Sequence, residues 1–125
     1  MSLSTIALLC AGGALGAVLR YWCTRLAAVI YPKLQFPLPT LFVNLTGSLV
    51  LGVVFGLLSP DPTAPLEAPL LLFFGVGFCG AYTTFSSFCV DTISLAGTSW
   101  NWALLYVLIT LGGSIGAFWL PFSIL

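Results

Sequence analysis

Four long apolar stretches separated by short joints constrain this chain more than any other feature of its sequence. They span residues 4–29, 38–59, 69–96 and 101–123, and each is long enough to cross a ~30 Å hydrocarbon core as a helix. Only 5% of the residues are charged, against roughly 25% in soluble domains. A soluble core cannot hide that much apolar surface, so the excess must face lipid. The sequence predicts an all-α integral membrane protein, with a single four-helix transmembrane domain over 1–125.

The joints between these stretches carry helix-breaking residues and an uneven distribution of positive charge. Each joint contains proline or glycine: YPKLQFPLP at 31–39, SPDPTAPLEAP at 59–69 and GTSWN at 97–101. Arg20, Arg25 and Lys33 lie in or before the first joint, whereas the other two joints contain no Lys or Arg. By the positive-inside rule, this bias predicts a cytoplasmic first joint with both termini outside, and so few charges leave a mixed orientation open.

Glycine pairs at four-residue spacing occur in three of the four stretches. They are Gly12 with Gly16, Gly52 with Gly56, and Gly112 with Gly116. This spacing places two residues without side chains on one helix face, where a neighbouring backbone can approach closely in lipid. The pattern predicts a tightly packed bundle that assembles as an oligomer. It leaves open which pairs act within a subunit and which act between subunits.

Polar side chains in the second and fourth stretches are costly at membrane depth and are therefore informative. Asn44 must face protein or water, and it either holds helices together or donates its NH2 group to an anion. Tyr106, Thr110 and Ser114 recur at intervals of four and form one hydroxyl stripe on an otherwise oily helix. Each hydroxyl could instead return its hydrogen bond to a carbonyl one turn earlier. Three hydroxyls in register favour the lining of a polar path.

The third stretch is longer than one crossing requires, and it contains the sequence GAYTTFSSF. Gly75, Gly77 and Gly80, followed by two β-branched threonines, weaken a helix and predict a break near the bilayer midplane. Broken helices in membranes coordinate Na⁺ with freed carbonyls and direct their positive N-terminal ends at anions. Phe85 and Phe88 lie three residues apart on one face, where the positive edges of their rings could contact a desolvated anion.

Reaction chemistry is not predicted. The sequence has no histidine, no nucleophile–base pair, no metal-ligand cluster and no basic patch, so we expect neither an enzyme nor a nucleic-acid-binding protein. The main alternative is a small multidrug-type proton-coupled exporter, which is also built from four helices. Such an exporter needs a membrane-embedded carboxylate in its first helix, and residues 4–29 contain no Asp or Glu. A non-conducting scaffold would explain the glycines but not the polar stripe.

Three blocks of the sequence resemble the CrcB/Fluc family of fluoride channels: GGALGAVLRY at 12–21, PTLFVNLTGSLVLG at 39–52 and GFCGAYTTFSSF at 77–88. The fourth stretch resembles the family through its hydroxyl stripe. The resemblance implies an antiparallel, dual-topology homodimer with two narrow fluoride pores and a central structural Na⁺. It also implies passive export of fluoride from the cytoplasm across a prokaryotic plasma (inner) membrane, which lowers the toxic internal concentration. The charge bias around the first joint also allows pairing with an oppositely oriented homologue.

The same resemblance implies roles for individual residues by their position. The implied fluoride pore is lined by Asn44, Phe85, Phe88, Tyr106, Thr110 and Ser114. Arg20 matches an arginine near the aqueous vestibule, and the backbone carbonyls of Gly80 and Thr83 match the Na⁺ ligands supplied by both subunits. Asp91 stands where the family usually has Glu, so its shorter carboxylate is expected to reach a partner less well. The implied partners are fluoride, membrane lipid and a second subunit.

Overall fold

The computed structural model describes residues 1–58 and 68–125, and nearly all of them are helical. The helices are, in chain order, α1 (Leu3–Ile30), α2 (Leu38–Leu58), the π-helical η1 (Leu71–Cys79), α3 (Gly80–Tyr82), α4 (Phe85–Ala96) and α5 (Trp100–Ile124). Within the described ranges, α1, α2, α5 and the run Leu71–Ala96 are each long and apolar enough to cross a membrane. The prediction of an all-α membrane protein with four spanning helices is therefore confirmed.

The ends of the helices follow from local capping chemistry. Ser2 and Ser99 cap the N-termini of α1 and α5, because their side-chain oxygens accept hydrogen bonds from the amides of Thr5 and Trp102. The second predicted joint, at 59–69, lies almost entirely outside the described residues, and so does the last residue of the second predicted helix.

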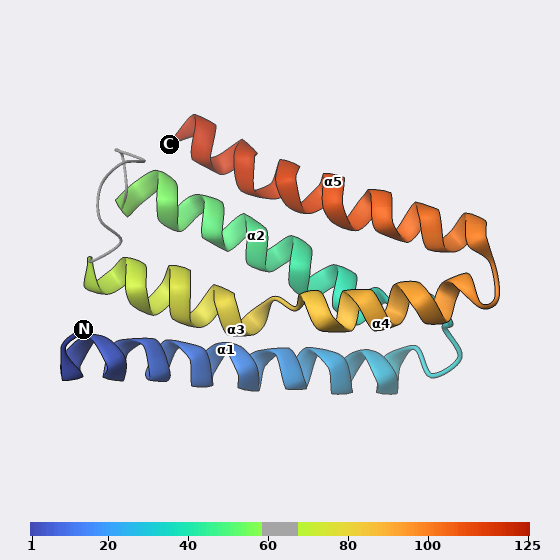
Figure 1. Ribbon diagram of the computed structural model, residues 1–125, viewed down its shortest axis with the longest axis horizontal. Helices are drawn as coiled ribbons and strands as arrows, with labels where there is room; N and C mark the ends of the chain where they lie inside the picture. Colours follow the sequence, from blue (N-terminus) through green and yellow to red (C-terminus); the bar gives the residue numbers. More distant parts are fainter. Residues whose placement is uncertain (59–67) are drawn as a thin grey trace.

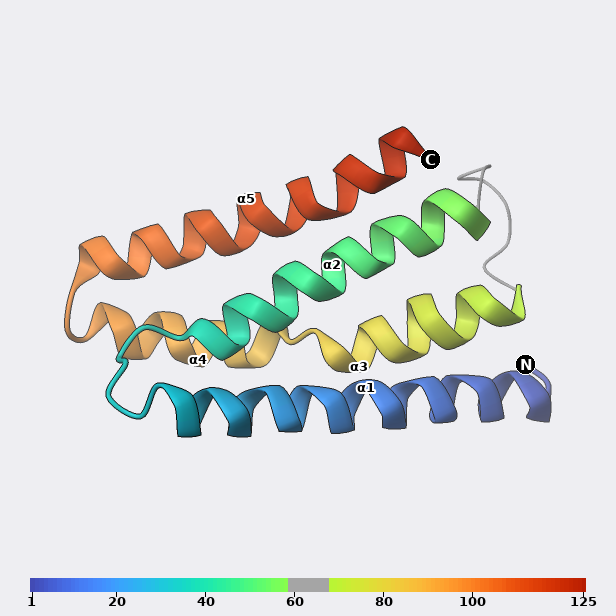
Figure 2. The same ribbon diagram turned by 180° about the vertical axis from the view of Figure 1, so that it is seen from behind.

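The helices pack into an elongated bundle in which the third span occupies the middle. Figures 1 and 2 show η1, α3 and α4 following one another between α1 on one side and α2 with α5 on the other. Here α1 packs along η1 and α3, α2 packs along α5, and α4 packs against α5. Both chain termini lie at the same end of the bundle (Figure 1). The third span therefore contacts the other three helices along its length.

Two of the three glycine pairs bring helices of one subunit into backbone contact. A Cβ at Gly12 would overlap the Phe73 carbonyl oxygen, and a Cβ at Gly16 would overlap the Phe78 carbonyl oxygen. We call this contact the α1–η1 seam. Gly52 lies in the same way against the Phe118 carbonyl oxygen of α5. These glycines are required because the approach leaves no room for a side chain.

The third glycine pair, Gly112 and Gly116, has nothing packed against it in the described part of the subunit. No heavy atom of the described residues lies within 4 Å of where a Cβ would stand at Gly112 or Gly116. The structure thus shows which glycine pairs pack within one subunit, a question that the sequence left open. The first two pairs serve packing within the subunit, whereas the third lies on a face of α5 that this subunit does not cover.

Candidate functional site

The third span is interrupted at Thr83 and Thr84. Thr83 has ψ 160°, and Thr84 is extended with φ −148° and ψ 124°. This break separates α3, which ends at Tyr82, from α4, which begins at Phe85. The predicted break in the third helix is confirmed. It lies at the threonines that follow the glycines, and Gly80 itself is still helical at φ −62° and ψ −36°. The β-branched threonines, rather than the glycine, adopt the extended backbone.

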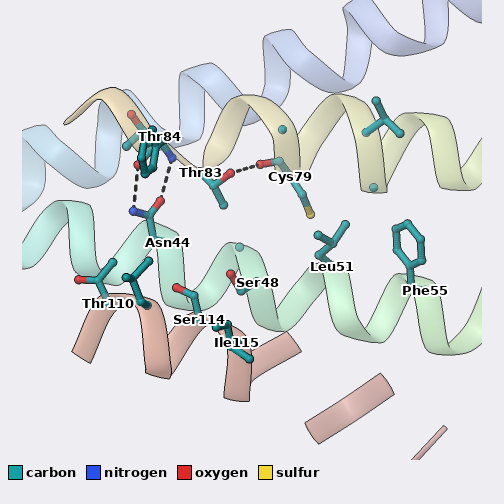
Figure 3. Close-up of a pocket in the computed structure, with 16 residues that line it drawn as sticks. Asn44, Ser48, Leu51, Phe55, Cys79, Thr83, Thr84, Thr110, Ser114 and Ile115 are labelled. Atoms are coloured by element: carbon teal, nitrogen blue, oxygen red, sulfur yellow. Dashed lines mark hydrogen bonds between the residues drawn. The ribbon is translucent and has the colours of Figure 1, made fainter. Parts of the chain in front are cut away.

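Asn44 of α2 satisfies the backbone that the break exposes. Its Nδ2 donates to the Thr84 carbonyl oxygen at 2.9 Å, and its Oδ1 accepts from the Thr84 amide at 2.8 Å (Figure 3). Asn44 is 9% exposed, so both bonds form in a buried setting. Of the two roles that the sequence left open, the structure realises the one that holds helices together. A second hydrogen on Nδ2 is not used by these two bonds, and the pore role of Asn44 stays a prediction.

The break releases the last carbonyl groups of the first half-helix from helical hydrogen bonding, among them those of Gly80 and Thr83. In a continuous helix, the Thr84 amide would donate to the Gly80 carbonyl and the Ser87 amide to the Thr83 carbonyl. Here the Thr84 amide donates to Asn44, and the Ser87 amide donates to Thr84 Oγ1 at 3.2 Å. The carbonyls of Gly80 and Thr83 therefore lose their helical donors at the negative, C-terminal end of the first half-helix.

These carbonyls fit the ligand set that a hard monovalent cation accepts. Both residues line the groove described below, and Gly80 is exposed. The Thr83 carbonyl oxygen accepts from the guanidinium Nη1 of Arg20 at 3.4 Å, so it already attracts a positive charge. No group of three or more His, Cys, Asp or Glu side chains occurs in the described part of the chain.

Three hydroxyls on α5 are buried without a partner. They are Tyr106 Oη, Thr110 Oγ1 and Ser114 Oγ, and none of them has a hydrogen bond within 1–58 and 68–125. Elsewhere in the chain a helical hydroxyl donates to the carbonyl one turn earlier, as Thr92 does to Phe88 at 2.7 Å. Since buried polar atoms are paired in most proteins, three unpaired hydroxyls in one stripe are unusual. They form a row of hydroxyls for which the described part of the chain supplies no partner.

The two phenylalanines after the break have different surroundings. Phe88 is 7% exposed, and its ring centroid lies 5.5 Å from that of Tyr106. Phe85 is 73% exposed, and its ring centroid lies 5.7 Å from that of Phe88. One ring is therefore seated beside the first hydroxyl of the stripe. The other ring projects from the subunit.

Asp91 of α4 is held by a hydroxyl of α2. Thr40 Oγ1 donates to Asp91 Oδ2 at 2.6 Å. Thr40 is 9% exposed, and Tyr106 is a further neighbour of the carboxylate. Although Asp is shorter than Glu, the Asp91 side chain thus reaches a partner on the adjoining helix. This pair lies at the same end of α5 as Tyr106, beyond the break.

An open groove of about 480 Å³ collects these features. It lies between α2, the third span and α5 (Figure 3). The predicted site residues that line it are Asn44, Gly80, Thr83, Phe85, Thr110 and Ser114. Arg20, Phe88 and Tyr106 do not line it, although Arg20 reaches Thr83 from α1 and the Phe88 ring lies beside that of Tyr106.

The groove also contains residues that the sequence did not single out for a site. Gly47, Ser48, Cys79 and Thr84 line it. Ser48 lies one turn after Asn44, so helical spacing alone would have placed it on the same face. Thr84 carries no comparable signal, because its role depends on backbone atoms that Asn44 reaches only in the folded bundle.

The N-terminus of α4 faces the same groove. Thr84 is the N-cap of this twelve-residue helix, and both Thr84 and Phe85 line the groove. The first amides of a helix have no helical acceptors and form its positive end. Free hydroxyls and a helix N-terminus together make this region suited to an anion. The released carbonyls suit a cation.

The fold and the site define a class of protein: a multi-pass helical membrane protein with a groove at a broken helix, lined by both polar and apolar residues. The chain belongs to a particular family within that class, the family described as CrcB-like protein, Camphor Resistance (CrcB), which matches residues 7–122. The resemblance found in the sequence is thereby confirmed.

Relatives of the chain are bacterial proteins named as channels. Fluoride-specific ion channel FluC from Rhodospirillum rubrum is 46% identical over 86 residues, which cover 69% of this chain and 66% of that protein. Fluoride-specific ion channel FluC 1 from Halalkalibacterium halodurans is 40% identical over 113 residues, 89% of each chain. Fluoride-specific ion channel FluC from Pseudomonas putida is 39% identical over 123 residues, 98% of this chain and 97% of that protein. The chain is a multi-pass bacterial membrane protein.

Proposed function

We propose that this protein is a fluoride-selective channel that lets fluoride leave the cytoplasm passively and so lowers its toxic concentration. The observation that carries the proposal is the row of buried, unpaired hydroxyls at Tyr106, Thr110 and Ser114. The names of its relatives support the same ion. A membrane potential that is negative inside drives an anion outward without a coupled reaction.

The chemistry of the row suits a small anion. Fluoride is strongly hydrated, so removing its water is costly unless dense donors replace it. Tyr106, Thr110 and Ser114 supply neutral donors one helical turn apart, and their hydrogens are not committed to other atoms of the described chain. Conduction requires binding that is strong enough for entry and weak enough for exit. Neutral donors meet this need better than a fixed cation, which would hold the ion.

The positive end of α4 and the ring of Phe88 extend this environment. The Phe88 ring lies tilted beside that of Tyr106, so its positive edge adds a weak attraction for an anion near the first hydroxyl. Phe85 plays the same part in the proposal from its exposed position. Arg20, whose guanidinium contacts Thr83 from α1, draws anions to the vestibule.

The functional unit in this proposal is an antiparallel dimer. The groove contains released carbonyls and lies beside unpaired hydroxyls, and such groups are too costly to leave facing lipid. A second copy laid across the groove would cover them, and it would also cover Phe85 and the open pair Gly112 and Gly116. A homologue of opposite orientation would serve equally, and the positive charges before and within the first joint favour one orientation for this chain.

The same proposal includes a structural Na⁺ between the subunits. The carbonyl oxygens of Gly80 and Thr83 would hold it, because the break has removed their helical donors. When bound, the ion supplies positive charge that neutralises the C-terminal ends of the two half-helices. Thr83 turns its carbonyl out of the helical direction, the Gly80 carbonyl keeps that direction without a donor, and Asn44 takes the Thr84 amide that would otherwise occupy it.

Ion efflux from liposomes tests the function. Purified protein is reconstituted into vesicles loaded with fluoride or chloride, and an ionophore for the counter-cation starts the flux. We expect fluoride to leave rapidly and chloride to be retained. Equal efflux of both ions, or no fluoride efflux, would refute the proposal. Light scattering on the purified protein and accessibility of tags at each terminus test the dimer and its two orientations.

The proton-coupled exporter is not favoured. Helix α1 contains no acidic residue, and the relatives are named as channels. In the same liposomes, an exporter would need a proton gradient, whereas the proposed channel needs only an ion gradient.

A further inference from the structure

The residues around the break contact a short segment of α2, and each of them has its own partner there. Tyr82 Oη hydrogen-bonds Thr46 Oγ1 at 2.9 Å. The backbone amide and carbonyl of Thr84 both hydrogen-bond the side chain of Asn44. Between these two anchors, Thr83 lies against Gly47. We call α2 residues 44–47 the break cradle. Its two polar members hold the residues on either side of Thr83.

Gly47 leaves no room for a larger residue at this point. Gly47 is buried, and a Cβ placed on it would overlap Thr83 Cγ2 and lie 3.1 Å from Tyr82 Cδ1. The Thr83 methyl group cannot simply rotate away, because Thr83 Oγ1 donates to the Cys79 carbonyl oxygen at 2.8 Å and so fixes the side-chain torsion. Relief of the overlap would therefore require the backbone of Thr83 to move.

We propose that Gly47 is a positioning residue that sets where the broken backbone, and with it the ion pathway, lies. Thr83 carries one of the released carbonyls, and Phe85 follows it by two residues. A side chain at position 47 would push Thr83 away from α2 and strain the two Asn44 bonds to Thr84. Gly47 thus acts through Thr83 and does not itself contact an ion. The inference depends on the proposed fluoride function only for its flux measurement.

The role of Gly47 is tested by making the same substitution in two forms of the protein that differ at residue 83. Gly47→Ala is made in the wild-type chain and in the T83S variant, because serine keeps the Oγ bond to Cys79 and lacks the Cγ2 that the new Cβ would meet. Gly13→Ala is the matched control, since a Cβ there would stand 3.8 Å from the Gly77 carbonyl oxygen, an ordinary contact. Hydrogen–deuterium exchange of residues 82–88 and fluoride efflux are measured for each protein.

In the wild-type background we expect Gly47→Ala to accelerate exchange at 82–88 and to lower fluoride efflux about tenfold or more, as small displacements of a site do. In the T83S background the same substitution should change each quantity by less than about twofold, because the coupling partner is gone. An equal effect in both backgrounds, or no effect in the wild type, would overturn the inference.

Two further outcomes also decide the matter. If Gly47→Ala yields no folded protein in the wild-type background, recovery of folded protein with T83S supports the inference, and failure in both backgrounds refutes it. If the wild-type protein conducts no fluoride, the proposed function fails, and the exchange measurements alone still test Gly47.

Discussion

In the α1–η1 seam backbone lies directly against backbone, whereas beside the groove buried polar groups have no hydrogen-bond partner in the described chain. The seam glycines Gly12 and Gly16 leave no gap between α1 and the carbonyls of η1. On the groove side, Thr110 and Ser114 have hydroxyls without partners in the described chain. The difference shows that one face of the third span is built for rigidity and the other holds unused hydrogen-bonding capacity. A rigid seam keeps that capacity in place.

The largest effect is expected from a substitution that adds a side chain within the α1–η1 seam. Gly12→Ala would place a methyl group on the Phe73 carbonyl oxygen. Backbone cannot rotate aside as a side chain does, so we expect the free energy of unfolding to fall by about 3 kcal/mol, at the upper end for overpacking. SDS- or heat-induced unfolding of the purified protein measures the change. Gly13→Ala on the same helix is the control, and equal stability of the two variants would contradict a tight seam.

The two hydrogen bonds between the Asn44 side chain and the Thr84 backbone hold the break against α2. Their loss should have the next largest effect on stability. Asn44→Ala leaves the buried amide and carbonyl of Thr84 without their partners. We expect a loss of about 2 kcal/mol in the free energy of unfolding, since each unsatisfied buried group costs ~1–3 kcal/mol. Asn44→Asp can still accept from the Thr84 amide, but its second oxygen would face the Thr84 carbonyl oxygen as a buried, unpaired charge, so this variant should be no more stable than Asn44→Ala in the same unfolding assay. Wild-type stability of Asn44→Ala would mean that the break does not need this amide.

Removing a groove hydroxyl should spare the fold and impair conduction. Thr110→Val keeps the shape of the side chain and deletes an unpaired oxygen, so the free energy of unfolding should change by less than about 0.5 kcal/mol. Fluoride efflux should fall about tenfold, the equivalent of one lost hydrogen bond of ~1.4 kcal/mol. Thr92→Val is the control, because its hydroxyl already donates to Phe88. A Thr110→Val channel with full flux would remove Thr110 from the pathway.

Phe85 should show the smallest effect on the subunit itself. Phe85→Ile changes a side chain that is 73% exposed, so unfolding of the subunit should be altered by less than about 0.5 kcal/mol. We nevertheless expect fluoride efflux to fall to background, since the ring belongs to the proposed pathway. Efflux from liposomes and dimer content by light scattering are measured on the same preparation. Normal flux with an intact dimer would place the ring outside the pore.

The broad architecture could be predicted from the sequence because it depends on length and hydropathy. Residues 101–123 were expected as a helix, and α5 runs from Trp100 to Ile124. The hydroxyl stripe was visible because helical spacing fixes which residues share a face. The break was expected over GAYT at 80–83; it lies at Thr83 and Thr84, whereas Gly80 stays helical. A glycine lowers the cost of leaving a helix, yet it does not decide where the freed backbone finds partners.

What the sequence determined by itself, then, was local or periodic: four apolar spans, a weak point in the third, and polar residues at helical intervals. Only the tertiary structure decided which contacts those features make. It assigned Gly12 to a seam and left Gly112 open, and it gave the Asn44 amide to the backbone of Thr84. The physical reason is that a spacing fixes the face of a helix, whereas the partner on that face depends on which helix packs there and at what register.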